Sequence, residues 1–379
     1  MRLAIVTSFP SNLNSPAGGV EAVSVNLVQA LSEFEDLDIE VVTTKQDCYS
    51  QLTEDWGKVR IHRLPWAGGG MLRNAIGPGR RQMQEYLRKI EPDIIHAHDT
   101  YGLLVKGMAI PRVFTIHGFI YGDVKVSNSK FASLRWRIWR HFETSGWAYQ
   151  QHIISISPYV REKLHGIAKG VIHDIDNPVS QSFFNIKRKE RKKTIFCAAA
   201  LIPRKNILVL INAVASMISK GIDVELRLAG SLANEEYIRK IRELIQERKL
   251  NKNIILLGSL NAEQIREELS AASIFALTSL EENSPMGIEE AMAAGIPVVT
   301  SNRCGMPYMV RDGESGFLVN PNDLNDIAHR LEQILTNDEL RLSMGAKGKE
   351  IALDRFDSSK VAARTRDVYL KAICDFKDK

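Results

Sequence analysis

The sequence predicts an α/β protein built from two Rossmann-like, doubly wound domains. Its 379 residues exceed one ordinary hydrophobic core. Short, β-branched apolar runs alternate with segments of helical periodicity, a pattern typical of a parallel sheet covered on both faces. The alternation stops at a charge-rich run, SQSFFNIKRKERKK at 180–193, and then begins again.

The first domain is expected at residues 1–180. Apolar runs without the alternation of a half-exposed strand predict buried strands at 3–9, 39–45, 93–99, 112–118 and 152–157. Residues 20–33 and 79–90 place apolar side chains at helical spacing. Residues 181–193 follow as the predicted linker, because their charges suit a solvated connection better than a nucleic-acid patch.

The second domain is expected at residues 194–355. The same patterns predict strands at 194–201, 224–230, 253–259, 274–279 and 297–301, and helices at 205–219, 234–248, 261–272 and 288–294. The sequence is helical from about residue 322, and we expect a C-terminal helix at 356–379 to return to the N-terminal domain. Ligands of such sheets bind beyond the carboxyl ends of the strands, so functional residues are sought there.

The composition is that of a globular protein with no specialised partner. A net charge of +5 is far below that of a dedicated nucleic-acid binder, so no nucleic acid is expected. The four cysteines have no paired spacing, which favours a reducing cytosol. The apolar run in MRLAIVTSFP is too short for a signal peptide, and no run is long enough to span a bilayer. We expect a cytoplasmic or peripheral location.

The segment EENSPMGIEEAMAAGIPVVTS at 281–301 follows an expected strand. Glu282 and Glu290 lie on either side of a Pro-Met-Gly turn that opens a helix. A helix N-terminus attracts phosphate, and carboxylates accept hydrogen bonds from hydroxyls. The pattern therefore indicates a ligand with both phosphate and sugar groups. The alternative is that the acids only complement the helix dipole.

This E-x7-E pattern, followed by AMAAGIPVV, resembles the donor-binding signature of the retaining GT-B glycosyltransferases of family 4. SNRCGMPYMVRDGESGFLV at 301–319 continues the resemblance, which extends over nearly the whole chain. It implies a GT-B fold with two domains facing a central cleft. The N-terminal domain would bind the acceptor, and the C-terminal domain would bind a nucleotide-sugar.

The resemblance also implies a donor site. Glu282 would act in catalysis by holding the donor sugar, Glu290 would hold the ribose, and the residues against the diphosphate would be Met286, Gly287 and Ile288, with Gly230 nearby. In AAALIPRKN, Lys205 matches the family's catalytic lysine, whereas Ala200 stands in place of its arginine. Arg204 is the candidate substitute, unless Arg204 and Lys205 are merely basic residues opening a helix.

Two further departures lie within and after the Gly-Gly turn of the family. Cys304 replaces the first glycine, and Tyr308 stands where the family usually has glutamate. We therefore expect no donor hydroxyl contact at Tyr308.

In the first domain, PAGGVE opens a helix after the first strand. Gly18 and Gly19 are the predicted donor-phosphate contacts, although the segment by itself also fits an ordinary helix entry. It is not GxGxxG, so an NAD site is not supported. His117 matches the family's catalytic T-H-G histidine. HAHD at 96–99 lacks a third metal ligand, so no metal or other cofactor is expected. Asp99 is either an acceptor contact or a helix N-cap.

Two basic segments of the first domain have two interpretations each. FASLRWRIWRHFETSGW at 131–147 fits a helix on an anionic membrane or a core helix with a basic rim. The loop at 71–81, which contains Arg80 and Arg81, would face a phosphate-bearing, lipid-linked acceptor. The acceptor expected from the resemblance is a glycan, possibly linked to a polyprenyl diphosphate.

These features predict a retaining glycosyltransferase of bacterial surface-polysaccharide or glycan-precursor assembly. The family favours a UDP-sugar first and a GDP-sugar second, and it is metal-independent. The leaving diphosphate itself would take the acceptor proton. Two alternatives stay open: a sugar-nucleotide 2-epimerase, and a non-catalytic protein that binds nucleotide-sugars.

Overall fold

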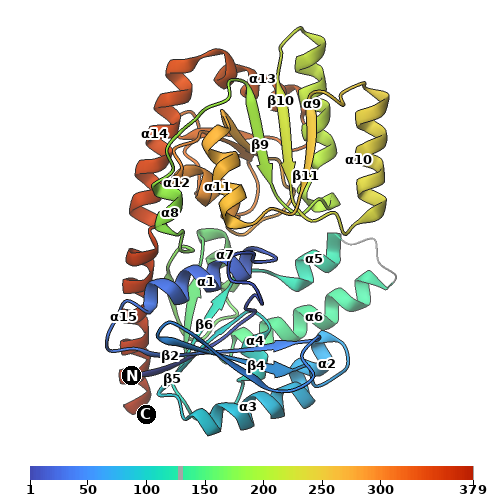
Figure 1. Ribbon diagram of the computed structural model, residues 1–379. Helices are drawn as coiled ribbons and strands as arrows, with labels where there is room; N and C mark the ends of the chain where they lie inside the picture. Colours follow the sequence, from blue (N-terminus) through green and yellow to red (C-terminus); the bar gives the residue numbers. More distant parts are fainter. Residues whose placement is uncertain (127–130, 379) are drawn as a thin grey trace. The chain divides into compact units, whose positions relative to one another are not determined.

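The computed structural model describes residues 1–126 and 131–378 of the chain (Figure 1). The chain folds into two compact units. The first comprises Met1–Ser11, Ala17–Pro178 and Ser358–Lys379, and the second comprises Asn12–Pro16 and Val179–Asp357. The chain therefore leaves the first unit after Pro178 and returns to it at Ser358, near the boundaries expected at 180 and 355.

The first unit is built on an eight-stranded sheet. Its order is β3-β4-β2-β1-β5-β6-β7-β8, and all neighbours are parallel except β3 and β4. The strands are β1 Arg2–Val6, β2 Asp38–Lys45, β3 Leu52–Trp56, β4 Val59–Pro65, β5 Ile94–His98, β6 Arg112–Ile116, β7 His152–Ser155 and β8 Val171–Asp174. Burial on both faces explains the continuous apolar sequences of the inner strands, such as β1, β5 and β6.

Helices cover this sheet on both faces (Figure 1). They are α1 Gly19–Leu31, α2 Met71–Ile76, α3 Pro78–Ile90, α4 Tyr101–Leu104, α5 Ile120–Val126, α6 Ala132–Trp147, α7 Pro158–Leu164 and the C-terminal α15 Ser358–Lys377. α15 packs against α1 and β6, and one core cluster joins the sheet to α3, α4, α6 and α7.

The second unit is built on a six-stranded parallel sheet of order β11-β10-β9-β12-β13-β14. The strands are β9 Thr194–Ala198, β10 Glu225–Ala229, β11 Ile254–Gly258, β12 Ile274–Leu277, β13 Val298–Ser301 and β14 Gly316–Val319. Its helices are α8 Gln181–Phe184, α9 Ile207–Ser219, α10 Glu235–Glu247, α11 Ala262–Ala271, α12 Met286–Ala293, α13 Leu324–Thr336 and α14 Asp338–Arg355, with short 3₁₀ turns at Pro203–Lys205 and Met306–Tyr308.

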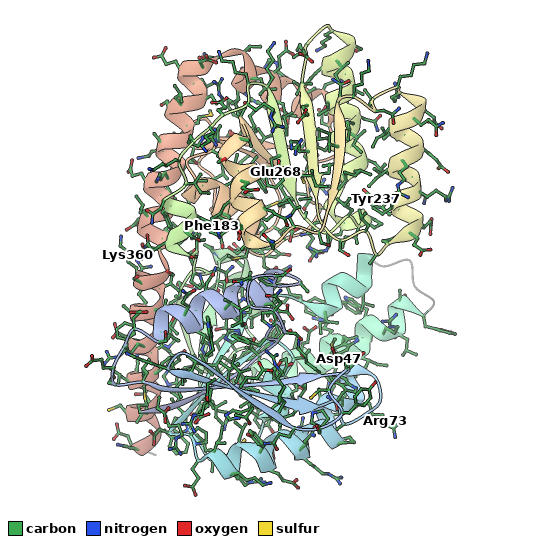
Figure 2. All side chains as sticks on the ribbon, in the orientation of Figure 1. Asp47, Arg73, Phe183, Tyr237, Glu268 and Lys360 are labelled. Atoms are coloured by element: carbon green, nitrogen blue, oxygen red, sulfur yellow. The ribbon has the colours of Figure 1, made fainter. Side chains whose placement is uncertain are left out.

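Packed side chains fill the space between this sheet and its helices (Figure 2). Glu268 of α11 accepts two hydrogen bonds from Arg227 of β10, at 2.5 and 2.7 Å. The hydroxyl of Tyr237, on α10, accepts a hydrogen bond from the backbone of Leu208 at 3.3 Å. That contact fixes the start of α9, which directly follows the predicted site residue Lys205.

The predicted linker at 181–193 is part of the second unit. It begins with α8 and then runs along the C-terminal end of α11. The guanidinium of Arg188 donates to the carbonyl oxygens of Leu269 (2.9 Å) and Ala272 (2.6 Å), and the backbone N–H groups of Lys189 and Arg191 donate to carbonyl oxygens of the last turn of α11. The charges of this run therefore attach it to the domain rather than solvate a free connection.

Candidate functional site

Strand order locates the ligand crevice of the second unit. β9 lies at the centre, and the chain winds outward from it through β10 and β11 on one side and β12 to β14 on the other. In such sheets, ligands bind at the carboxyl ends of the strands where the winding reverses. The loops after β9 and β12 meet there, since the backbone N–H of Leu280 donates to the carbonyl oxygen of Arg204 at 2.9 Å.

Three of the predicted donor-site side chains meet in these loops. The guanidinium of Arg204 donates to Oε2 of Glu282 at 3.2 Å and to the carbonyl oxygen of Glu281 at 2.6 Å. Nζ of Lys205 donates to Oε1 of Glu282. Glu282 is only 8% exposed. The site is therefore a buried carboxylate held between two cations, with one positive charge in excess.

The pKa of Glu282 reflects that arrangement. Burial alone raises the pKa of this carboxyl, but attraction to Lys205 and then to Arg204 outweighs burial and holds the pKa below its usual value. Glu282 is therefore ionised at neutral pH. The carboxylate fixes both cations, and the two cations together suit a ligand with more than one negative charge.

Helix α12 opens beside this cluster at Met286, two positions before the expected start at 288. Gly287 and Ile288 therefore lie in its first turn, and no side chain caps the helix. A Cβ at Gly287 would lie 2.8 Å from Cζ of Phe275 and 3.2 Å from the carbonyl oxygen of Ala198. The glycine is thus required by the packing of α12 against the sheet, whatever ligand binds.

Glu290 lies one turn further along α12. Burial raises the pKa of Glu290 to about 8, and the positive charge of Arg266 opposes this rise only in part. At neutral pH its carboxyl is protonated, so it can donate one hydrogen bond and accept others. The two acids of the E-x7-E motif thus differ in charge, and a neutral Glu290 is suited to a diol.

Gly230 follows β10 at the same edge. A Cβ at this position would overlap the carbonyl oxygen of Ala199, and its φ of 151° is one that other residues rarely adopt. Gly230 therefore shapes the loop at Ala200, where the family's arginine is missing. Its predicted contact with the donor stays a prediction.

The loop after β13 contains the two departures from the family motif. Cys304 adopts a left-handed conformation with φ of 55°, which glycine adopts with less strain. The next backbone N–H, of Gly305, still donates to the carbonyl oxygen of Glu282 at 2.8 Å. Tyr308 is 39% exposed, and its carbonyl oxygen accepts a hydrogen bond from Arg355 at 2.7 Å. The substitutions leave this loop attached to that of Glu282.

In the first unit, the winding reverses between β1 and β5. Gly18 is the N-cap of α1 and Gly19 its first residue, and no side chain caps this helix. The carboxylate of Glu21 instead accepts hydrogen bonds from the backbone N–H of Ala17 (2.8 Å) and the hydroxyl of Ser8 (3.2 Å). Apart from its two chain neighbours, no described residue has an atom within 4 Å of a Cβ built at Gly18. This helix start is therefore sterically open.

Asp99 and His117 follow the neighbouring strands β5 and β6. Oδ1 of Asp99 accepts hydrogen bonds from the backbone N–H groups of His117 (2.7 Å) and Gly118 (3.2 Å). Asp99 is therefore not an N-cap, a position that Thr100 takes in α4. It fixes the loop of His117, whose ring contacts that of His98 with 3.1 Å between Nε2 and Nδ1.

The segment 71–81, expected as a loop, is instead helical and forms α2 and the start of α3. The two basic candidates for acceptor binding, Arg80 and Arg81, lie on α3. Nε of Arg80 donates to the carbonyl oxygen of Leu103 at 2.9 Å, and partial burial lowers the pKa of Arg80. Arg81 is exposed. Arg80 thus connects α3 to α4, while Arg81 is the more accessible cation of the pair.

α6 has a mixed surface. Trp139 and Trp147 are buried, as a core helix requires. Phe131, Leu134 and Ile138 at its N-terminal half are 77%, 58% and 39% exposed. Exposed cations alternate with them, namely Arg135, Arg137 and Arg140. The buried tryptophans fit the interpretation as a core helix, and contact with a membrane by the exposed side chains stays a prediction.

Within residues 1–126 and 131–378, no three His, Cys, Asp or Glu side chains are arranged to hold a metal ion. None of the helices in the same ranges is long and apolar enough to cross a bilayer.

Three neighbours of the predicted residues were missed from the sequence. His98 contacts the ring of His117, Asn177 hydrogen-bonds it, and Arg266 lies close enough to Glu290 to lower the pKa of that carboxyl. Only His98 has a signal in the sequence, the HAHD motif, whose spacing by itself indicates no more than an incomplete metal site. Asn177 and Arg266 lie far from their partners in sequence and belong to no motif.

Known proteins resemble the chain along its length. An uncharacterised glycosyltransferase of Methanocaldococcus jannaschii is 26% identical, and the match covers 95% of this chain and 97% of the relative. An MMP alpha-(1->4)-mannosyltransferase of Mycolicibacterium hassiacum is 28% identical over 76% of this chain and 72% of the relative.

Solved structures share the fold. A sucrose-phosphate synthase of Thermosynechococcus elongatus superposes with a TM-score of 0.85 at 20% identity, covering 99% of each chain. HepE of Anabaena, in complex with UDP-glucose, gives a TM-score of 0.75 at 17% identity, over 98% of this chain and 100% of HepE. The two Rossmann-like domains therefore form a GT-B fold, the fold of a class of glycosyltransferases.

Family models match both halves of the chain. Residues 17–183 match the model described as "Glycosyltransferase Family 4", and residues 179–351 match "Glycosyl transferases group 1". The chain belongs to the group 1 glycosyltransferases of family 4, so the family expected from its motifs is confirmed and the protein is a glycosyltransferase.

Proposed function

We propose that this glycosyltransferase moves a hexosyl or N-acetylhexosaminyl group from a nucleotide-diphosphate-sugar to a glycan, with retention of the anomeric configuration. The observation that supports it most is the ion cluster of Arg204, Lys205 and Glu282 at the switch point of the second sheet. The diphosphate gains negative charge as it leaves, and cations held in place beforehand stabilise that charge.

In this proposal each site residue has a role. Lys205 and Arg204 bind the diphosphate beside the first turn of α12, where Met286, Gly287 and Ile288 lie against it. Glu282 contacts the donor sugar, and neutral Glu290 exchanges hydrogen bonds with the ribose diol. Gly18, Gly19 and His117 contact the donor from the first domain. The acceptor hydroxyl loses its proton to the leaving diphosphate, and no metal ion or other cofactor takes part.

The donor is a UDP-sugar in the first instance and a GDP-sugar in the second. HepE was solved with UDP-glucose, whereas two mycobacterial relatives are named as GDP-mannose-dependent mannosyltransferases. The names of the relatives favour transfer over the epimerase alternative. The same names, which are those of transferases, also disfavour a non-catalytic nucleotide-sugar binder.

The acceptor is a glycan, in our proposal one linked to a polyprenyl diphosphate at the cytoplasmic face of a bacterial membrane. A putative colanic acid glycosyltransferase of Salmonella typhimurium, 30% identical over 41% of this chain, is consistent with polysaccharide assembly. The exposed apolar and basic side chains of α6 would contact anionic lipid there, and Arg81 would lie toward the acceptor phosphates.

A thermal-shift panel of UDP, GDP and ADP, with NAD as control, tests donor binding. A diphosphate at 100 times its dissociation constant is expected to stabilise the protein by about 2.7 kcal/mol, whereas NAD is expected to give no shift. The anomeric configuration of the product then tests retention. No shift with any of the diphosphates would contradict the proposed donor site.

A further inference from the structure

The ring of His117 lies in a column of buried aromatic rings inside the first unit. His98, the last residue of β5, is 1% exposed, and its ring centroid lies 4.9 Å from that of His117. On the other side of His98, the ring of His96 is 4.5 Å away, and Tyr369 of α15 follows. The column connects a predicted catalytic histidine to the C-terminal helix.

Both ring nitrogens of His96 form hydrogen bonds with residues other than His98. Its Nδ1 is 2.8 Å from the hydroxyl of Tyr369, and its Nε2 is 2.7 Å from the hydroxyl of Thr115. Burial lowers the pKa of His96 to about 3, so this ring is neutral. His96 therefore packs against the ring of His98 but forms no hydrogen bond with its nitrogens, because both nitrogens of His96 bond to Tyr369 and Thr115.

The contact between His98 and His117 allows two arrangements of protons. Either Nδ1–H of His98 donates to Nε2 of His117, or Nε2–H of His117 donates to Nδ1 of His98. In the second arrangement His98 carries its proton on Nε2, a buried atom with no hydrogen-bond partner among the described residues. Buried N–H groups without an acceptor are rarer in proteins than buried acceptors without a donor. The first arrangement is therefore favoured.

Burial lowers the pKa of His117 and outweighs the charge of Asp99 and the hydrogen bond with Asn177, which raise it. The ring of His117 is therefore neutral near pH 7 and carries a proton on only one of its two nitrogens. The contact with His98 decides which nitrogen that is.

We propose that His98 is a positioning residue for His117: it donates Nδ1–H to Nε2 of His117 and thereby keeps the proton of His117 on Nδ1. This inference rests on the proposed function, in which His117 contacts the donor. Only Nδ1 of His117 can then donate to a donor oxygen. Asp99 fixes the backbone of the same residue, so ring and backbone of His117 are held by two adjacent residues at the carboxyl end of β5.

The tautomer of His117 tests this directly and needs no substrate. Nitrogen-15 NMR of the full-length protein with labelled histidines is expected to show a protonated Nδ1 and a bare Nε2 for His117. His98→Asn retains a donor near the position of Nδ1 and is expected to preserve that spectrum. His98→Leu removes the donor and is expected to shift His117 toward the Nε2–H tautomer. An unchanged spectrum in His98→Leu would overturn the proposal.

A matched control separates positioning from loss of stability. His152, the first residue of β7, is 2% exposed, and its ring contacts His173 and Asp375 rather than His117. His152→Leu removes an equally buried imidazole from the same sheet. It is expected to lower the melting temperature while leaving the His117 spectrum unchanged. A shift of the His117 signals in this variant would mean that the loss of any buried imidazole changes the tautomer of His117, and not the loss of His98 in particular.

Turnover gives the second measurement. It is followed as nucleoside diphosphate released from UDP-glucose, UDP-N-acetylglucosamine and GDP-mannose. His98→Leu is expected to lower kcat by up to about a hundredfold, with less change in KM, and His98→Asn to recover most of the loss. If none of these donors is turned over by the wild type, the proposed function is in doubt, yet the NMR comparison still decides the role of His98.

Discussion

At the scale of single residues, the two acids of the E-x7-E motif have opposite electrostatic properties. Glu282 is ionised between two cations, whereas burial raises the pKa of Glu290 to about 8. Between the ordinary pKa of 4.5 and the raised pKa of about 8, Glu290 keeps in the native state a proton that the unfolded chain has lost. The stability that Glu290 contributes is therefore fully present below pH 4.5, decreases as the pH rises, and is lost once the pH has passed the raised pKa of about 8.

We expect Glu290→Gln to remove this pH dependence. Between pH 5 and 8, the free energy of unfolding of the wild type should fall relative to that of the variant, by about 1.4 kcal/mol per pH unit. Urea unfolding at four pH values measures the difference. Glu282→Gln is the control: the pKa of Glu282 is lowered, so this residue changes the free energy of unfolding only at more acidic pH. Parallel curves for the wild type and Glu290→Gln would contradict the prediction.

Glu282→Gln is also the sharpest test of the donor site. The amide has the same shape but cannot neutralise Lys205 and Arg204, so both cations lose their orientation. Turnover is expected to fall by about a hundredfold or more, with the fold retained. Release of nucleoside diphosphate measures it. Glu281→Gln is the control, because Arg204 donates to the backbone carbonyl oxygen of Glu281, which this substitution retains. Near-normal turnover in Glu282→Gln would rule out the assignment.

The sequence indicated which residues gather at the second sheet but not how they pair. Glu282 and Lys205 were both predicted as site residues from motifs. Their ion pair was not, because nothing in either motif specifies which side chain turns toward which. Asp99 was recognised as a site candidate, yet its role in holding the His117 loop depends on the spacing of β5 and β6. Such contacts between distant segments are fixed by sheet register, which local sequence patterns do not contain.

At the scale of elements, the helix starts were predicted better than the sheet edges. Apolar runs gave the central strands of both sheets. The hairpin of β3 and β4 was missed because β3, LTEDW, is polar and mostly exposed at the edge. Its only signal is the Trp-Gly-Lys turn, in which Gly57 has a φ of 59°. β8 was missed for the same reason, and β14 because its glycine obscured a strand of four residues.

Two glycines at helix or loop starts are expected to behave differently when replaced. Gly18→Ala places a Cβ in open space and should cost less than about 1 kcal/mol of stability. Because that Cβ enters the proposed phosphate position, the variant should nevertheless bind UDP or GDP more weakly. Thermal melts with and without diphosphate measure both effects.

Gly230→Ala is compared with Gly18→Ala because its added Cβ meets the backbone instead of open space. A Cβ there overlaps the carbonyl oxygen of Ala199, so the loop after β9 must move, and the melting temperature of the protein is expected to fall. A stable Gly230→Ala variant would show that this loop is adaptable, and Gly18→Ala with undiminished binding would remove α1 from the donor site.

At the scale of the whole molecule, exposed apolar side chains on α6 predict binding to anionic membranes. Phe131→Ser combined with Leu134→Ser is expected to abolish co-flotation with phosphatidylglycerol vesicles. Arg137→Ala should weaken binding roughly fivefold, since each cation near an anionic surface is worth about 1 kcal/mol. Leu342→Ser is the control: Leu342 is 66% exposed, on α14 of the other unit. Binding that survives the double substitution would exclude α6 as the contact.

The path of the chain between the two units has a consequence for recombination. Apart from Asn12–Pro16, the second unit is one uninterrupted stretch, Val179–Asp357, whereas α15 completes the first unit. A genetic exchange with two junctions, after Pro178 and before Ser358, can therefore replace nearly all of the second unit as a cassette. The recipient keeps α15, and with it the contact between Tyr369 and His96. A single crossover would instead pair one relative's first unit with another relative's α15.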